Sequence, residues 1–304
     1  MKILVGGSVA IDNVKTPSAD ETNLLGGSAS YAALAAAKLA NPVHLVGIVG
    51  HDFPQEHLAM LETSGVGLSG LERSEKESFT WSGEYHENMN DRTTHSVAIN
   101  VLEDWSVKVP DSLADAAFVV LANMAPHNQL EMLEQCGAPD RFVVADTMDL
   151  WITVANPELH EVLKKIDLLV INESEAREFV STNNLILAGE RLLAKGPRYV
   201  VIKLGEFGAL LFGPEGLFFR CGAWPLRDLA DPTGAGDTFL GGLIGELASK
   251  QAVVPSFDQL REAVVKGSIL ASFTCENFST KSLENAAIED FESRLERFRE
   301  ISAW

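Results

Sequence analysis

Short apolar runs alternate along this chain with segments of helical periodicity. Six runs rich in Val, Ile and Leu are typical of buried strands: Ile3–Gly6, Val43–Val49, Phe118–Leu121, Phe142–Ala145, Leu168–Ile171 and Tyr199–Leu204. Helical patterns lie between them, at Ala29–Leu39, Gln55–Thr63, Asn128–Gln135, Pro157–Lys165, Ser174–Ser181 and Leu187–Lys195. A further strand, Ala209–Phe212, follows the last run after a glycine-spaced turn. After Asp237 the pattern turns helical, at Gly241–Lys250, Phe257–Thr274 and Leu283–Arg299. This alternation predicts an α/β fold with a mostly parallel sheet and helices on both of its faces.

Two stretches break the alternation. Residues 12–25 are polar and rich in turn residues, and residues 78–101 contain alternating segments such as Phe79-Thr80-Trp81-Ser82. Long loops without structure are uncommon inside a compact domain unless they have a function. We therefore expect strands outside the main sheet, with two long surface loops as the alternative. Residues 1–304 are predicted to form a single domain that includes these two insertions.

Composition limits the possible partners. The formal net charge of −19 argues against a nucleic-acid partner, because binding a phosphate backbone requires a basic face. The three cysteines are widely spaced and form no metal-binding pattern, which suits reduced thiols in the cytoplasm. The chain has no long apolar run and no layout typical of a signal peptide, so we expect a cytoplasmic protein without a membrane partner.

The segment Asp231-Pro232-Thr233-Gly234-Ala235-Gly236-Asp237 carries the strongest functional signal. Small residues at the start of a helix leave N–H groups uncovered, and such groups with the helix dipole bind anions. A carboxylate in the same place is suited to accept a proton from a hydroxyl that attacks a bound phosphate. The alternative is an Asp that only caps a helix after a glycine-rich turn. Three further glycines, Gly241, Gly242 and Gly245, predict close packing of this helix against the sheet or a bound nucleotide.

This segment resembles the C-terminal signature of the PfkB (ribokinase-like) carbohydrate kinases, with Pro232 inserted between Asp231 and Thr233. The resemblance covers essentially the whole chain and implies a ribokinase-like three-layer α/β/α fold and a kinase that uses ATP and Mg²⁺. It implies that Asp237 is the catalytic base and that the amides of Gly234, Ala235 and Gly236 form the anion hole. Asp231 and Thr233 match positions that help to bind a monovalent cation such as K⁺. The two insertions, at about 12–25 and 78–101, would pair into a small β lid that also offers a surface for a homodimer.

The resemblance places the acceptor near the N-terminus, at Asp12, Gly26, Gly27 and Ser28. Asp12 follows the first strand, where a carboxylate can accept hydrogen bonds from sugar hydroxyls. A turn Asp and a helix-opening glycine pair are the structural alternative. Tyr31 stands where the family commonly has an Asn that contacts the sugar, which puts recognition of a simple ribose or fructose in doubt.

Asn172 and Glu175 resemble the family's NxxE motif, which organises Mg²⁺ and its waters. Their spacing also fits a capping box, and the two roles are compatible. Lys203, Gly205 and Gly208 match a KxGxxG motif that lines the nucleotide, and Asn277 is placed beside the adenine by resemblance only. After the strand Phe142–Ala145, only Asp146 remains of the family's Asp-x-Asn-x-Arg pattern.

The sequence thus predicts a kinase that phosphorylates a hydroxyl of a sugar or related polyol. Trp81, Tyr85 and Tyr31 could stack on a base, so a nucleoside kinase is one alternative. A catalytically silent protein that senses a sugar or a nucleotide is another. The chain has no P-loop motif and no protein-kinase signature.

Overall fold

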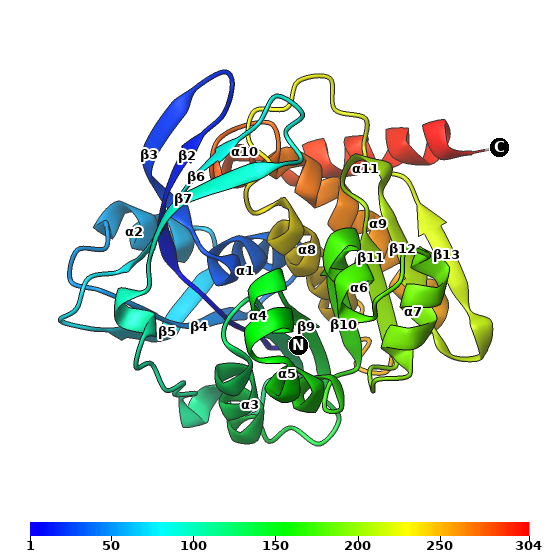
Figure 1. Cartoon of the computed structure of the whole chain (residues 1–304), viewed down its shortest axis with the longest axis horizontal. Helices are drawn as coiled ribbons and strands as arrows, with labels where there is room; N and C mark the ends of the chain where they lie inside the picture. Colours follow the sequence, from blue (N-terminus) through cyan, green and yellow to red (C-terminus); the bar gives the residue numbers. More distant parts are fainter. Residues whose placement is uncertain (304) are drawn as a thin grey trace.

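The computed structural model of this protein describes residues 1–303. A nine-stranded sheet with the order β13-β12-β11-β10-β9-β8-β1-β4-β5 forms its centre (Figure 1). Its strands pair in parallel except β12 and β13, which are antiparallel to their neighbours. The strands are β1 Ile3–Gly6, β4 Val43–Val49, β5 Val66–Arg73, β8 Phe118–Leu121, β9 Phe142–Asp146, β10 Leu168–Asn172, β11 Tyr199–Lys203, β12 Ala209–Phe212 and β13 Phe218–Cys221.

Helices cover both faces of this sheet, and side chains alternate between two cores. Ile3 and Val5 of β1 point into one core, and Leu4 points into the other. The first core is closed by α1, α2, α8 and α9, and the second by α3 to α7. The helices are α1 Ser28–Leu39, α2 Gln55–Thr63, α3 Pro126–Gln135, α4 Asp149–Val154, α5 Asn156–Leu163, α6 Glu173–Phe179, α7 Leu185–Leu193, α8 Ala235–Ser249, α9 Phe257–Thr274, α10 Lys281–Asn285 and α11 Ile288–Ser302. The predicted three-layer fold is confirmed.

A second, four-stranded sheet stands beside the main one, in the order β3-β2-β6-β7 (Figure 1). Its strands are β2 Ala10–Lys15, β3 Asp20–Gly26, β6 Phe79–Tyr85 and β7 Arg92–Ala98. The two insertions therefore form strands rather than surface loops. They join through a parallel pairing of β2 with β6.

The glycines of α8 allow α1 and α9 to approach this helix closely. We had expected these glycines to contact the sheet or a nucleotide instead. A Cβ on Gly241 would lie 2.1 Å from the carbonyl oxygen of Ala32 in α1. Gly242 faces Gly267 of α9 in the same way, with 3.0 Å to its Cα. The helix is thus wedged between α1 and α9, and its first turn is held in a fixed place.

The structure differs from the sequence prediction at the C-terminal helix and at several short elements. The predicted helix Leu283–Arg299 is two helices, because Ala286 and Ala287 are extended. Lys38 of α1 donates to the carbonyl oxygens of Glu284 and Ala286, at 2.8 and 3.1 Å, and so satisfies the end of α10. The helix predicted from Gly241 already begins at Ala235, and β5, β13 and α4 were not predicted. No helix among residues 1–303 is both long and apolar enough to cross a membrane.

Candidate active site

The main sheet changes its direction of growth between β1 and β8. The chain adds β4 and β5 on one side of β1 and then β8 to β11 on the other. In open α/β sheets ligands bind at such a point, beyond the carboxyl ends of the strands. A cavity of about 400 Å³ lies there, lined by strands of the second sheet and by the segments that follow β1, β8 and β9 of the main sheet. Its walls include Asp12, Ser28, Tyr31, Trp81, Tyr85, Arg92, Trp105, Asn123, Asn128, Trp151, Thr233, Gly234 and Asp237.

Asp12 follows β1 in the chain and lies inside β2, a strand of the second sheet. Its side chain is 5% exposed and lines the cavity. Gly26 on the neighbouring strand leaves room for it, since a Cβ there would lie 2.1 Å from the carboxylate. Burial, and then the charges of Asp231 and Asp237, raise the pKa of Asp12 to about 8. The protonated carboxyl of Asp12 can therefore both donate and accept a hydrogen bond near neutral pH.

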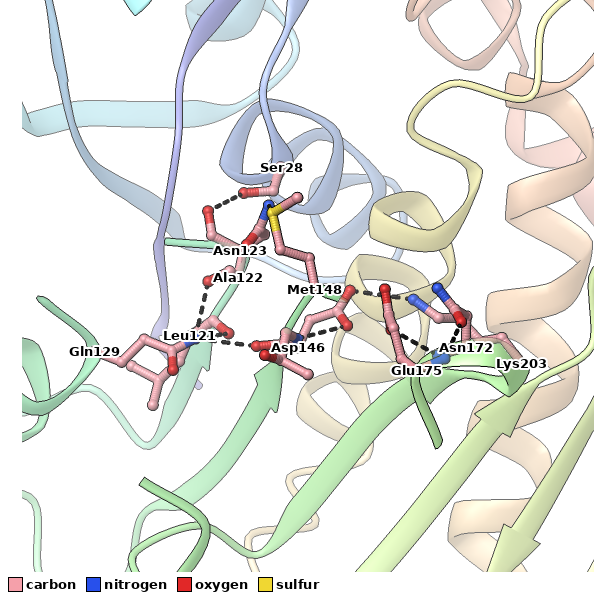
Figure 2. Close-up of polar contacts among 11 residues, drawn as sticks. Ser28, Leu121, Ala122, Asn123, Gln129, Asp146, Met148, Asn172, Glu175 and Lys203 are labelled. Carbon is pink, nitrogen blue, oxygen red and sulfur yellow. Dashed lines mark hydrogen bonds and ion pairs between the residues drawn. The ribbon is translucent and has the colours of Figure 1, made fainter. Parts of the chain in front are cut away.

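Gly27 and Ser28 stand at the start of α1 and also line the cavity. The Ser28 hydroxyl donates to the carbonyl oxygen of Asn123 at 2.9 Å, and its oxygen lies 3.2 Å from the Ser8 hydroxyl. Figure 2 shows the contact with Asn123. Ser28 thus ties α1 to the end of β8.

The loop before α8 turns sharply at Gly234, whose φ of +75° is left-handed. A Cβ on Gly234 would lie 2.4 Å from the ring of Tyr31, which is buried beneath the loop. The Ala235 N–H donates to the Pro232 carbonyl at 3.1 Å. Among residues 1–303 the N–H groups of Gly234 and Gly236 donate to no backbone carbonyl outside the helix. These two amides, at the positive end of the α8 dipole, form a place for an anion.

Beside this loop, three carboxylates share one lysine. Lys203, at the end of β11, lies 3.1 Å from the Asp146 carboxylate at the end of β9. Figure 2 shows Asp146, Glu175 and Lys203 pointing toward one another. The lysine also lies against α8, because a Cβ on Gly236 would be 2.8 Å from its Nζ. Burial and the charge of Asp146 raise the pKa of Asp237 to about 7, and Lys203 works against this shift. The pKa of Glu175 is raised to about 7 by the same two causes.

Asn172 and Glu175 form a capping box at the start of α6. The Asn172 Oδ1 accepts from the Glu175 N–H at 2.9 Å, and the Glu175 Oε2 accepts from the Asn172 N–H at 3.1 Å. The capping box that the spacing of these two residues predicted is therefore confirmed. Among residues 1–303 no group of three or more His, Cys, Asp or Glu side chains is arranged to hold a metal ion by itself. Two buried carboxylates whose negative charges repel each other nevertheless form a place where a divalent cation would be favoured.

The other residues predicted to bind the nucleotide lie outside the cavity. Gly205 and Gly208 enclose a short turn after β11. Gly205 faces the turn between β6 and β7, where a Cβ would be 3.8 Å from the Asn90 Oδ1. Asn277 is exposed after α9, and its Oδ1 accepts from the Phe278 N–H at 2.8 Å. Asp231 is fully buried and its carboxylate accepts from the Thr233 N–H at 2.9 Å.

The sequence profile of the pfkB family of carbohydrate kinases matches residues 6–286. This chain belongs to that family. The cytidine kinase of Thermococcus kodakarensis is 28% identical over 80% of this chain and 87% of its own length. A nucleoside kinase of Methanothermobacter thermautotrophicus is 25% identical over 76% of this chain and 74% of its own. The structure of a putative ribokinase II of E. coli in complex with ATP and Mg²⁺ has a TM-score of 0.79 and 17% identity, covering 97% of this chain and 99% of that one.

Within this pfkB-family chain the structure adds residues to the site that the sequence did not single out. Arg92, at the start of β7, lines the cavity with Asp237, and its charge lowers the pKa of Asp237. Asn123, Asn128, Trp105 and Trp151 line the cavity from the main body. Asn123 follows β8 closely, and the rule that ligands bind beyond the carboxyl ends of strands would have selected it. Arg92 offers no such signal, because it belongs to an insertion whose pairing the sequence leaves open.

Proposed function

We propose that this pfkB-family enzyme is an ATP-dependent nucleoside kinase in which Asp237 is the catalytic base. As a member of the family it is a phosphotransferase that acts on a hydroxyl group of a sugar or a nucleoside. The observation that carries the narrower proposal is the composition of the cavity. Asp12 and Asp237 line it together with the rings of Trp81, Trp105 and Trp151. A ribose with an attached base matches this combination of polar and aromatic surface.

The chemistry follows from the residues around the α8 loop. The acceptor hydroxyl attacks the γ-phosphorus of ATP while its proton passes to the Asp237 carboxylate. The bond between the γ-phosphorus and the bridging oxygen breaks, and ADP leaves with that oxygen. The N–H groups of Gly234 and Gly236, with Ala235 between them, stabilise the charge on the transferred group. Asp12 holds a second hydroxyl of the acceptor and so fixes which hydroxyl attacks.

ATP and Mg²⁺ are typical of ribokinase-like kinases, and one structural neighbour contains both. The residues proposed to hold Mg²⁺, in part through water, are Glu175 and Asn172. The ion would supply positive charge to the phosphates. Lys203 contributes a fixed positive charge beside Gly236. Nucleotide contacts by Gly205, Gly208 and Asn277 stay predictions.

A K⁺ ion at Asp231 and Thr233 rests on resemblance. Burial raises the pKa of Asp231, and a nearby cation would oppose that shift. Rates measured in K⁺ and Na⁺ at equal ionic strength test this site. The second sheet is proposed as a lid over the acceptor. A homodimer through that sheet, the absence of a nucleic-acid partner and a cytoplasmic location stay predictions.

The experiment is a phosphoryl-transfer screen with ATP and cytidine, uridine, adenosine, inosine, ribose and fructose, followed by substitution of the base. Asp237→Asn should lower kcat on the best acceptor by about 10²–10⁴, since a general base contributes about that much. Nucleoside affinity should change little, because the amide keeps the shape of the carboxylate. Asp140→Asn, an exposed carboxylate after α3, is the matched control.

Two results would contradict the proposal. A variant that keeps more than about a tenth of the wild-type rate would remove Asp237 as the base. Phosphorylation of ribose or fructose with no turnover of any nucleoside would overturn the nucleoside assignment and leave the kinase assignment intact.

A further inference from the structure

Two asparagines on one short segment face the cavity and take no part in the chemistry above. Asn123 follows β8, and Asn128 lies in the first turn of α3. Asn128 is 3% exposed, so its side chain is buried against the cavity wall. The wall around them is largely apolar and includes Met124, Met148 and Trp151. Two amides in such a wall are the groups able to recognise polar atoms of a ligand there.

The neighbours of Asn123 decide which way its amide points. The indole N–H of Trp151 lies 2.9 Å from the Asn123 Oδ1. An indole N–H is a donor only, so the amide oxygen must face Trp151. The amide nitrogen is left with the Met148 sulfur at 3.1 Å, and a thioether is a weak acceptor. Asn123 therefore offers a donor to the cavity.

Asn128 is fixed in the opposite sense. Its Nδ2 lies 2.8 Å from the Trp105 carbonyl oxygen and 3.3 Å from the Glu131 Oε2. The pKa of Glu131 is lowered against the effect of its burial, mainly by a hydrogen bond from the Val107 N–H, so both partners accept near neutral pH. The amide nitrogen must therefore face them. Among residues 1–303 no group donates to the Asn128 Oδ1. Because this oxygen is not among the fully buried polar atoms without a partner, it is open to the cavity and can accept from a ligand.

We propose that Asn123 and Asn128 read the polar edge of the acceptor's nucleobase, with Asn123 donating and Asn128 accepting. This inference rests on the proposed nucleoside kinase activity and adds specificity-determining residues to it. Cytosine and uracil present donor and acceptor in opposite order at ring positions 3 and 4. An amide pair of fixed orientation therefore matches one pyrimidine and mismatches the other. Trp151 acts through Asn123 and is a positioning residue.

Trp151→Phe tests the inference because it keeps an aromatic ring in the wall and removes the N–H that orients Asn123. The freed amide can turn over and serve either base. We expect wild-type kcat/KM to differ between cytidine and uridine by about tenfold or more, as for a site that hydrogen-bonds its substrate. Trp151→Phe should reduce this ratio by about fivefold or more, because the Asn123 amide no longer has a fixed orientation. Asn128→Ala should also reduce the ratio, by removing the acceptor.

Trp224→Phe is the matched control, since Trp224 packs on Arg294 outside the cavity. It should leave both the ratio and kcat unchanged. If the enzyme phosphorylates nucleosides but Trp151→Phe and Asn128→Ala change cytidine and uridine by the same factor, the asparagines do not read the base and the nucleoside kinase proposal stands. Equal wild-type kcat/KM for the two pyrimidines leads to the same conclusion. If no nucleoside is phosphorylated, the proposed function falls and this inference falls with it.

Discussion

Burial and the charges around Asp237 set the protonation of the proposed base. Asp237 and Glu175 both have pKa values raised to about 7 by burial and by Asp146, and Lys203 opposes both shifts. Because a base must be deprotonated to act, its activity rises with pH through its own pKa. After burial, the charge on Asp146 therefore contributes most to the pH at which Asp237 loses its proton.

Asp146→Asn should move the acid limb of the pH profile to lower pH. The substitution removes a negative charge near Asp237 and frees Lys203, and both effects make the charged form of Asp237 more favourable. We expect the midpoint of kcat/KM against pH to fall by about one unit. The measurement is the pH profile of both variants, with Asp140→Asn as the control. A midpoint that stays in place or rises would show that Asp146 does not act on the base.

Much of the site could be predicted at the level of single residues. Asp237, Gly234 and Asp12 belong to short patterns whose chemistry is local, and the structure places all three at one cavity. Asn128 could not be predicted in this way. Its significance comes from Trp105, whose carbonyl fixes the amide across a gap in the sequence that no local pattern bridges.

At the scale of elements, the second sheet carries Arg92 to the edge of the cavity. No hydrogen bond or ion pair holds its guanidinium among the described residues 1–303. In a chain with a net charge of −19, a cation left facing the α8 loop is suited to a phosphate.

Arg92→Met should slow phosphoryl transfer by about 10–10² and leave acceptor affinity nearly unchanged, since one charge-assisted hydrogen bond is worth about that factor. Lys15→Met removes a cation from the same sheet, where Lys15 pairs with Glu84 at 2.9 Å, and is the matched control. Steady-state rates at saturating ATP and acceptor report the effect. Equal rates for the two variants would place Arg92 outside the reaction.

Elements with a strong apolar pattern could be predicted from the sequence, and weakly patterned ones could not. Six strands of the main sheet were predicted to within about one residue because both of their faces are buried and they read as continuous apolar runs. Edge strand β5 reads Val-Gly-Leu-Ser-Gly-Leu-Glu-Arg and is buried mainly at Val66 and Gly70, so its pattern is too weak. The break between α10 and α11 depends on Lys38 of α1, which no local pattern contains.

At the scale of the whole molecule, the buried carboxylates of the site lower the stability of the folded state. Asp12, Asp231 and Asp237 lie close enough for their charges to raise the pKa of Asp12, and burial raises the pKa of each. The pKa of Asp12 is about 8 in the folded protein and 3.8 by its ordinary value. Between these values the folded state binds more protons than the unfolded state, so its stability falls as pH rises.

Asp12→Asn should therefore stabilise the protein, and the gain should grow with pH between about 4 and 8. At pH 8 we expect Tm to rise by about 2–4 °C, the effect of about 1 kcal/mol in a chain of this size. Thermal unfolding of both proteins at pH 5 and pH 8, without ligands, gives the comparison. A difference in Tm that is the same at both pH values would show that ionisation of Asp12 carries no such penalty.

Four chain connections join the second sheet to the main body, between β1 and β2, β3 and α1, β5 and β6, and β7 and the turn at Asn100–Leu102. A sheet joined to the main body by four connections cannot open as a separate flap on one hinge. Its freedom is a shallow tilt in which Asp12 and Arg92 travel together. Asp12, which holds the acceptor, and Arg92, which faces the phosphate, would then reach their positions in one movement. Without a bound acceptor, the phosphate site would therefore be incomplete as well.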